Sequence, residues 1–304
     1  MKILITSAGG PAAIGVIKSL HKFDVQGEHC IVATDMNEMS AGSKLADRRY
    51  IVPAADDDDF LPKIKEIINH ENIDLILPTS NMEIDQFDQL SDITNVFMSD
   101  SKTIKLCNDK WKFYNKVKDD FDIPYTWQDN DIKWMGCFAR PRYELGGSRG
   151  TLHCKDIHQY MSTYNSDVEY IYSDYLPGQE YTIDVLCDMK SNPIVAVPRK
   201  RLQTKEGISS KGQIVRDESI QEQCFDICKF LKLKGPVCIQ MKESVDNILK
   251  FVEINPRFGG GSYMATLAGV NFMELILYII NGYDYWVPKP KEITVLRYYN
   301  EVVV

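Results

Sequence analysis

The feature that most constrains the fold is a pair of strand-like runs, 237–242 and 251–257, separated by Asp246-Asn247. Asp and Asn tolerate the positive φ that two-residue hairpin loops require, so residue 245 is predicted to pair with residue 248. Apolar side chains then alternate with polar ones along both runs. The pattern predicts an antiparallel hairpin with one apolar face packed on a core and one polar face.

The polar face of this hairpin has the composition of a metal site. Counting back from the loop places Gln240 directly opposite Glu253, and the period of two puts Asn255 on the same face. Mg²⁺ takes oxygen ligands, keeps several waters and is usually completed by substrate phosphates, so these side chains suggest a nucleotide site. A half-buried hairpin with a solvated polar face is the alternative, and the hairpin alone does not decide between the two.

Composition bounds the class of protein. A chain of 304 residues is long enough for about two domains, and 44% hydrophobic with 26% charged residues is typical of a globular protein. No stretch approaches about eighteen apolar residues and no signal peptide is visible, so we expect a cytoplasmic protein without a membrane partner. The eight cysteines form no Cys-x-x-Cys pair, which favours reduced thiols. The net charge of -8 disfavours nucleic acid as a partner.

Residues 1–100 alternate short apolar runs with helical stretches, the pattern of a parallel α/β layer. The first turn, 7–14, contains two glycines and Pro11 near a helix start, which makes it a candidate anion loop. It lacks the Gly-x-Gly-x-x-Gly spacing, and Asp35 is only loosely like a ribose-binding acid, so a dinucleotide role is disfavoured. Glu83 follows a later strand and could face a substrate, although we favour an acid at a helix N-terminus.

A second domain is predicted to start near residue 100, where a capped helix over 108–117 precedes a strand at 136–140. The glycine-rich segment 145–150 lies between apparent strands, and its backbone amides could wrap phosphate oxygens. Alternation over 180–186 predicts a further strand with Glu180 and Asp184 on one face. That face is either a polar strand surface or a set of acceptors for ribose hydroxyls.

A basic loop is predicted over 199–212 in an otherwise acidic chain. Its cations are Arg199, Lys200, Arg201, Lys205 and Lys211. A solvated loop and a site that captures carboxylate or phosphate remain equally open for this segment. Helices are predicted over 217–232, 263–268 and 272–280.

The order of these features resembles the ATP-grasp superfamily over nearly the whole chain, most closely its carbamoyl-phosphate-synthase-like branch of carboxylate-amine ligases. The hairpin looks like the metal-binding hairpin of that family. The resemblance implies that Gln240, Glu253 and Asn255 hold Mg²⁺, or Mn²⁺ in its place, and that Arg257 contacts the nucleotide phosphates.

The resemblance also implies an ATP site. Lys110 matches the basic residue that opens the family's ATP-grasp domain, and Arg140 stands where many members carry lysine and the synthase branch carries arginine. The implied nucleotide-binding residues of the glycine loop and the adenine hinge are Gly146, Gly147, Ser148, Arg149, Gly150, Tyr172, Ser173, Asp174, Tyr175 and Leu176. Glu180 matches the ribose-binding carboxylate. Ser173-Asp174 replaces the Glu-Lys or Glu-Glu of many relatives, a change that recognition through backbone atoms tolerates.

The fold that the resemblance implies is α/β. A Rossmann-like pre-ATP-grasp domain is expected over 1–100, and an ATP-grasp domain with an antiparallel sheet over 101–304. The ATP-grasp domain is expected to have a small lobe at about 113–172 and a large lobe at about 173–304.

The implied function is an ATP-dependent ligase. It would convert a small-molecule carboxylate into an acyl phosphate, which an amine, or a thiol, then attacks. Arg199, Arg201 and Lys211 would hold the carboxylate, and Arg257, Arg140 and Lys110 would neutralise charge during phosphoryl transfer. A kinase that stops at the phosphorylated intermediate and a catalytically silent ATP-binding module are the alternatives. A dehydrogenase is the least favoured alternative. The resemblance leaves open whether the protein is a homodimer.

Overall fold

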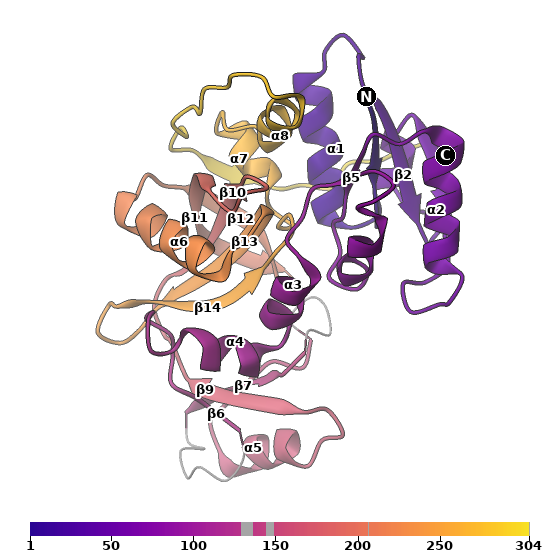
Figure 1. Ribbon diagram of the computed structural model, residues 1–304. Helices are drawn as coiled ribbons and strands as arrows, with labels where there is room; N and C mark the ends of the chain where they lie inside the picture. Colours follow the sequence, from indigo (N-terminus) through magenta and orange to yellow (C-terminus); the bar gives the residue numbers. More distant parts are fainter. Residues whose placement is uncertain (129–135, 144–148, 206, 304) are drawn as a thin grey trace.

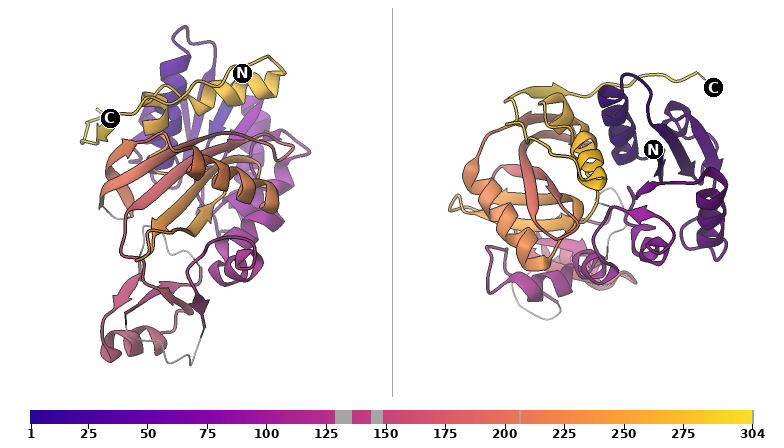
Figure 2. Two further views of the ribbon diagram at one scale, coloured as in Figure 1. Left: turned by 90° about the vertical axis from the view of Figure 1, so that its left-hand side faces the viewer. Right: turned by 45° about the horizontal axis from the view of Figure 1, so that its top comes forward.

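The computed structural model describes residues 1–128, 136–143, 149–205 and 207–303 (Figure 1). Figure 1 shows three parts, with an N-terminal sheet flanked by helices at the right, a larger sheet at the left and a small lobe below. Figure 2 shows that the small lobe projects away from the other two parts. No helix among the described residues is long and apolar enough to cross a bilayer.

The N-terminal part is a parallel sheet with helices on both faces. Its five strands have the order β3-β2-β1-β4-β5. Their bounds are β1 Lys2–Ile5, β2 Cys30–Asp35, β3 Arg48–Ile51, β4 Leu75–Leu77 and β5 Asn95–Val96. Helix α1 (Pro11–Phe23) packs on one face with Ile3 and Ile5, and α2 (Phe60–Glu71) packs on the other with Leu4. The predicted Rossmann-like layer is confirmed.

Short helical segments connect the N-terminal sheet to the rest of the chain. The 3-10 helices are η1 Gly42–Leu45 and η2 Ile84–Leu90, and the α-helices that follow β5 are α3 Ser101–Asn108 and α4 Lys110–Val117. The helix predicted over 108–117 therefore begins at Lys110, because Asp109 caps it by accepting hydrogen bonds from the N–H groups of Trp111 and Lys112.

The small lobe is a four-stranded antiparallel sheet with one helix. Its strand order is β6-β9-β7-β8. The bounds are β6 Thr126–Trp127, β7 Cys137–Pro141, β8 Leu152–Cys154, α5 Ile157–Tyr164 and β9 Tyr170–Asp174. Trp127, Tyr160 and Tyr172 form the centre of its small core.

The large lobe is a six-stranded antiparallel sheet in the order β14-β13-β10-β11-β12-β15. The strands are β10 Glu180–Cys187, β11 Pro193–Lys205, β12 Ile208–Ile214, β13 Gly235–Glu243, β14 Leu249–Asn255 and β15 Thr294–Leu296. Helix α6 (Glu218–Leu231) covers one face, and α7 (Tyr263–Leu267) and α8 (Phe272–Asn281) cover the other. The predicted antiparallel sheet and the three predicted helices are present.

The N-terminal sheet and the large lobe share one hydrophobic core. The apolar face of α1 packs against residues of α7 and α8, including Met264, Phe272 and Ile276. Polar contacts join the same surfaces, since Ser19 Oγ lies 2.8 Å from Thr266 Oγ1. This shared core fixes the strand ends of the N-terminal sheet relative to the large sheet.

The segment 199–212 was predicted to be a loop, and that prediction is wrong. Its residues form the end of β11 and the start of β12, paired as an antiparallel hairpin with Arg199 opposite Ile214. Charge composition suggested a solvated loop, but the backbone is paired with β10 on one side and the side chains alternate between faces. Tertiary pairing overrides composition here.

The hairpin loop of β13 and β14 also differs from the prediction. Ser244 N donates to Ile248 O over 2.8 Å, and Asn247 has a φ of 60°, so the loop contains three residues rather than two. A β-bulge between Gln240 and Met241 shifts the register back by one residue. Gln240 consequently lies opposite Glu253 as predicted, although residues 245 and 248 do not pair as expected.

Candidate active site

A cleft with a volume of about 640 Å³ lies where the three parts of the molecule meet. The N-terminal sheet contributes the turns after β1, β2 and β4, from Ser7 to Ala12, Asp35 to Asn37 and Thr79 to Met82. The large lobe contributes Gln240, Glu253 and other residues of β11 to β14, and the small lobe contributes the end of β7. Because β1 and β4 are neighbours whose connections run to opposite sides, the cleft lies at the switch point of the parallel sheet.

The three predicted metal ligands lie together in this cleft. Gln240, Glu253 and Asn255 all line it. Asn255 donates from Nδ2 to Glu253 Oε1, while its Oδ1 accepts from Asn81 Nδ2 over 2.7 Å. A metal beside Glu253 would therefore meet an Asn255 oxygen only after that amide turns. One carboxylate and two amides, completed by external oxygens, suit a hard, magnesium-like ion. The described residues contain no cluster of three His, Cys, Asp or Glu side chains.

The charge on Glu253 is maintained by its neighbours. Burial alone would raise its pKa, but the positive charges of Lys110, Arg140 and Arg257 and the hydrogen bond from Asn255 lower it below the ordinary value. Burial lowers the pKa of Arg140, and the Glu253 charge opposes that effect. Glu253 is consequently ionised at neutral pH in a cleft where cations predominate around it.

Arg257 connects the β13–β14 hairpin to the N-terminal sheet. Its Nε donates to Asn81 Oδ1 over 2.6 Å, and its Nη1 donates to the carbonyl of Phe258 over 2.9 Å. Asn81 lies in the segment after β4 from which sequence reasoning selected only Glu83. Glu83 directly precedes the 3-10 helix η2, as favoured from the sequence, and it lies buried beneath the turn after β1, where Thr6 Oγ1 donates to it. No sequence pattern indicates a role for Asn81 beyond its place after a strand.

Lys110 and Arg140 reach the cleft from different elements. Lys110 is the first residue of α4, and its backbone N–H donates to the carbonyl of Arg142 over 3.1 Å. Arg140 lies on β7 and donates from Nη1 to the carbonyl of Val252 over 3.0 Å. Arg149 also lines the cleft, whereas Gly146, Gly147 and Ser148 lie outside the described residues.

The predicted adenine hinge borders a second, smaller cavity. Ser173, Asp174, Tyr175 and Leu176 line a space of about 40 Å³ that shares Arg140 with the main cleft. The Tyr172 side chain points into the small-lobe core, and burial raises its pKa to about 12. Tyr175 stacks on His153 with ring centroids 3.7 Å apart and an interplanar angle of 5°. No role for His153 was predicted from the sequence, because tertiary pairing of its strand brings it to Tyr175.

Of the residues predicted to bind the ribose and the carboxylate substrate, some line the cleft and others do not. Glu180 accepts from Arg201 Nη1 over 2.6 Å, and Arg201 also lines the cleft near Gln240. Arg199 lines the cleft too, but it is 1% exposed and paired over 2.8 Å with Asp184, which is 2% exposed. Lys211 is on β12, opposite Leu296 of the edge strand, and does not line the cleft. Two of the three predicted substrate cations therefore reach the site.

The fold and the arrangement of the site are similar to those of ATP-grasp proteins, and family models match two parts of the chain. More particularly, residues 166–302 match the family "ATP-grasp in the biosynthetic pathway with Ter operon", and residues 3–98 match the family "PylC-like, N-terminal domain". A comparison with curated proteins gives no match.

Solved structures similar to this chain include a synthetase, a carboxylase domain and a ligase. The chain is similar to N5-carboxyaminoimidazole synthetase from Staphylococcus aureus complexed with ADP, with 15% identity, a TM-score of 0.74 and coverage of 94% of this chain and 78% of that one. It is similar to the biotin carboxylase domain of 2-oxoglutarate carboxylase from Hydrogenobacter thermophilus, in complex with MgADP, ADP and bicarbonate, at 17% identity, TM-score 0.72 and coverages of 95% and 71%. It is also similar to L-amino acid ligase from Bacillus licheniformis, with 12% identity, a TM-score of 0.72 and coverage of 91% of this chain and 73% of that one. At these identities the likeness concerns the fold.

Proposed function

We propose that the protein is an ATP-dependent ligase that activates a carboxylate as an acyl phosphate and then joins it to an amine. One observation carries this proposal. Glu253, Gln240 and Asn255 share a cleft with Lys110 and Arg140, and the same cleft opens on the switch point of the N-terminal sheet. This arrangement supports a metal-phosphate site that would face a second binding surface in one space.

The nucleotide would lie between the two lobes of the 101–304 domain. The base would enter the small cavity beside Ser173 to Leu176, and the ribose would lie near Glu180, which Arg201 orients. Lys110 and Arg140 would contact the phosphates, and Arg257 would contact the transferred phosphoryl group. Mg²⁺, when bound by Glu253, Gln240 and Asn255, would neutralise phosphate charge and align the γ-phosphoryl group for transfer.

The chain's own residues supply positioning and charge rather than a covalent nucleophile. Phosphoryl transfer needs the attacking carboxylate oxygen in line with the γ-phosphate and positive charge around the equatorial oxygens. Arg140 and Arg257 come from the two sides of the cleft and would meet at the transferred group. The carboxylate oxygen would bond to the γ-phosphorus as the bond to ADP breaks, and ADP would leave with that electron pair. The amine would then attack the acyl carbon and release a proton to water, forming the C–N bond as inorganic phosphate leaves with the electron pair of the C–O bond.

The second substrate would bind over the turn after β1. Gly9 and Gly10 lie in that turn, and a Cβ at Gly9 would come within 3.0 Å of the Asp35 carboxylate, so the backbone approaches its neighbours closely there. Arg201 would hold the carboxylate of the activated substrate from the opposite wall. The likeness to carboxylases and to an amino acid ligase supports a carboxylate-activating ligase and leaves the particular acid and amine open.

The experiment is ADP release from Mg·ATP against a panel of carboxylates and amines. Glu253→Gln keeps the side-chain shape and removes the charge, so we expect turnover to fall at least about a hundredfold. Asp246→Asn is the matched control, because it removes a carboxylate from the exposed loop of the same hairpin. ADP release that needs both substrates supports the ligase, release with the carboxylate alone supports the kinase, and binding without release supports a silent module. Near-normal turnover in Glu253→Gln would refute the metal assignment.

A further inference from the structure

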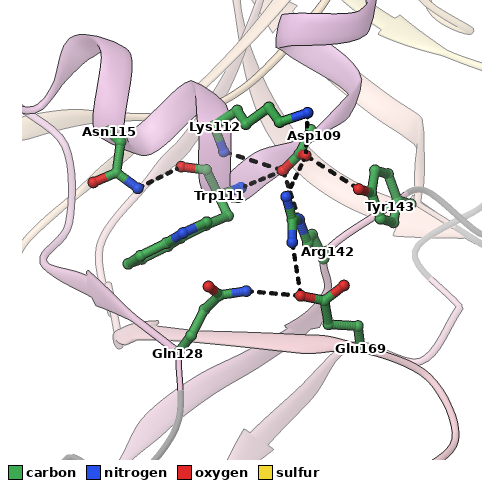
Figure 3. Close-up of polar contacts among 8 residues, drawn as sticks. All are labelled: Asp109, Trp111, Lys112, Asn115, Gln128, Arg142, Tyr143 and Glu169. Carbon is green, nitrogen blue, oxygen red and sulfur yellow. Dashed lines mark hydrogen bonds and ion pairs between the residues drawn. The ribbon is translucent and has the colours of Figure 1, made fainter.

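Asp109 and Arg142 form a partly buried ion pair, and Figure 3 shows its polar contacts. Asp109 and Arg142 form a two-point contact, in which Arg142 Nε donates to Oδ1 over 2.8 Å and Nη2 donates to Oδ2 over 2.6 Å. Asp109 is 2% exposed. Burial alone would raise the Asp109 pKa, but the hydrogen bonds from Arg142 and the Lys112 N–H lower it to about 2. The pair is therefore ionised across the whole range in which the protein would work.

Each partner of this pair is next to a cation of the cleft. Asp109 immediately precedes Lys110 on the chain and caps the helix that Lys110 begins. Arg142 follows Arg140 by two residues, and its N–H continues the sheet by donating to the carbonyl of Glu169 over 2.8 Å. Arg142 directly follows β7 and continues its pairing with the segment before β9, so its position constrains that of Arg140 two residues earlier.

A backbone hydrogen bond joins the same two segments as the ion pair between Asp109 and Arg142. The Lys110 N–H donates to the Arg142 carbonyl over 3.1 Å, so α4 and the end of β7 are joined at two levels. Tyr143, which lines the cleft, donates from its hydroxyl to Asp109 Oδ2 over 3.2 Å and lies 5.2 Å from the Arg142 guanidinium carbon. The Asp109 carboxylate thus contacts Tyr143 directly, and it is linked to Lys110 through the helix cap and to Arg140 through Arg142.

Holding Lys110 and Arg140 together has an electrostatic cost. Both positive charges act on Glu253 and lower its pKa, so both lie near one carboxylate and repel each other when the cleft holds no phosphate. A rigid ion pair between their supporting elements opposes that repulsion, and its planar fork fixes direction as well as distance.

We propose that Asp109 and Arg142 are positioning residues that hold Lys110 and Arg140 at a fixed separation, so that the two cations reach the ATP phosphates as a unit. The inference rests on the proposed function, in which both cations contact ATP. A purely structural role would give the pair an effect on folding alone.

Two variants test the pair without removing the helix cap. Asp109→Asn keeps an oxygen for the N–H groups of Trp111 and Lys112 and removes the charge. Arg142→Lys keeps the charge and removes the two-point contact. Glu169→Gln is the matched control, because it removes the charge of a 50% exposed carboxylate that contacts Arg142 over 2.7 Å outside the cleft.

The measurements are ATP affinity by titration with a fluorescent ATP analogue, steady-state ADP release and melting temperature. We expect Asp109→Asn and Arg142→Lys each to weaken ATP binding and to lower kcat at saturating ATP by about tenfold or more, because small displacements of aligned groups are costly. Glu169→Gln should stay within about twofold in both. Lower melting temperatures with unchanged affinity and kcat would overturn the positioning role.

The outcomes separate this inference from the proposed function. A wild-type protein that neither binds Mg·ATP nor releases ADP would refute the proposed function and the inference together. A wild-type protein that binds and turns over ATP, alongside an Asp109→Asn or Arg142→Lys variant that does so equally well, would refute the positioning role and leave the ligase proposal standing.

Discussion

Asn81 and Arg257 join the N-terminal sheet to the β13–β14 hairpin through a hydrogen bond of 2.6 Å between Arg257 Nε and Asn81 Oδ1. The same asparagine donates from Nδ2 to Asn255 Oδ1 over 2.7 Å. One side chain from the turn after β4 therefore contacts both a predicted metal ligand and a predicted phosphate ligand. Because the second substrate is proposed to lie over the neighbouring turn after β1, Asn81 connects the two halves of the proposed reaction.

Replacing Asn81 should separate nucleotide binding from turnover. Asn81→Ala removes the acceptor for Arg257 Nε and the donor to Asn255, so Arg257 loses its fixed orientation while the hinge is untouched. We expect kcat to fall about tenfold or more while ATP affinity changes by less than about threefold. Asn95→Ala is the control, since Asn95 bonds the exposed carbonyl of Asp74 on the same sheet. Equal effects of the two variants would contradict the role given to Asn81.

Arg199 and Asp184 form a buried ion pair whose loss should affect stability. Asp184→Ala leaves the Arg199 charge buried without its partner, and breaking such a pair costs about 3–5 kcal/mol of unfolding free energy. Urea unfolding measures this cost. Glu66→Ala, which breaks an exposed pair with Lys63 on α2, should cost less than about 1 kcal/mol. The double variant Asp184→Leu with Arg199→Met should recover most of the loss, and an equally unstable double variant would argue against an electrostatic cause.

Two exposed methionines line the proposed site of the second substrate. Met36 follows β2 and is 69% exposed, and Met82 follows β4 and is 68% exposed, so they stand on either side of the turn after β1. Exposed, polarizable side chains at a cleft favour a substrate with an apolar group. Burying about 50 Å² of that group at about 25 cal/mol per Å² corresponds to about a tenfold change in affinity.

The substrate prediction follows from that estimate. Met36→Gln and Met82→Gln keep side-chain length, so we expect them to raise KM for apolar substrates about tenfold and to leave KM for ATP unchanged. Met39→Gln is the matched control, because Met39 is also 69% exposed but does not line the cleft. The assay compares KM for substrates of one class that differ only in their apolar group. A uniform response of the three variants would contradict the prediction.

Local sequence patterns predicted the parts of the site that depend on one hairpin. Gln240 and Glu253 face each other because side chains alternate along two adjacent strands, and an unforeseen bulge compensated for a longer loop. Asn81 was missed because its partner Arg257 is 176 residues away. No local pattern marks such a pair. The Asp184 to Arg199 pair was missed for a related reason, since an arginine in a basic run suggests a solvated side chain until the strand pairing is known.

Glu83 supplies a test of how the turn after β1 is supported. Its side chain is buried, with 4% of the residue exposed, and it accepts a hydrogen bond from Thr6 Oγ1 at the end of β1. Burial raises its pKa from 4.5 to about 7, against the lowering effect of hydrogen bonds from Thr6 and Ser7. Ser7 has a φ of 49°, so this hydrogen bond supports a turn in an unfavourable backbone conformation.

The raised pKa of Glu83 predicts how stability depends on pH. Between about pH 4.5 and about pH 7 the folded protein binds a proton that the unfolded chain releases, so the free energy of unfolding falls as pH rises through this window. The full difference corresponds to at most about 3 kcal/mol. Glu83→Gln keeps an acceptor for Thr6 and removes the titration, so its unfolding free energy relative to wild type should rise between about pH 5 and about pH 8. Urea unfolding across that range measures the difference, and parallel curves for the two proteins would show that Glu83 titrates as an ordinary exposed carboxylate.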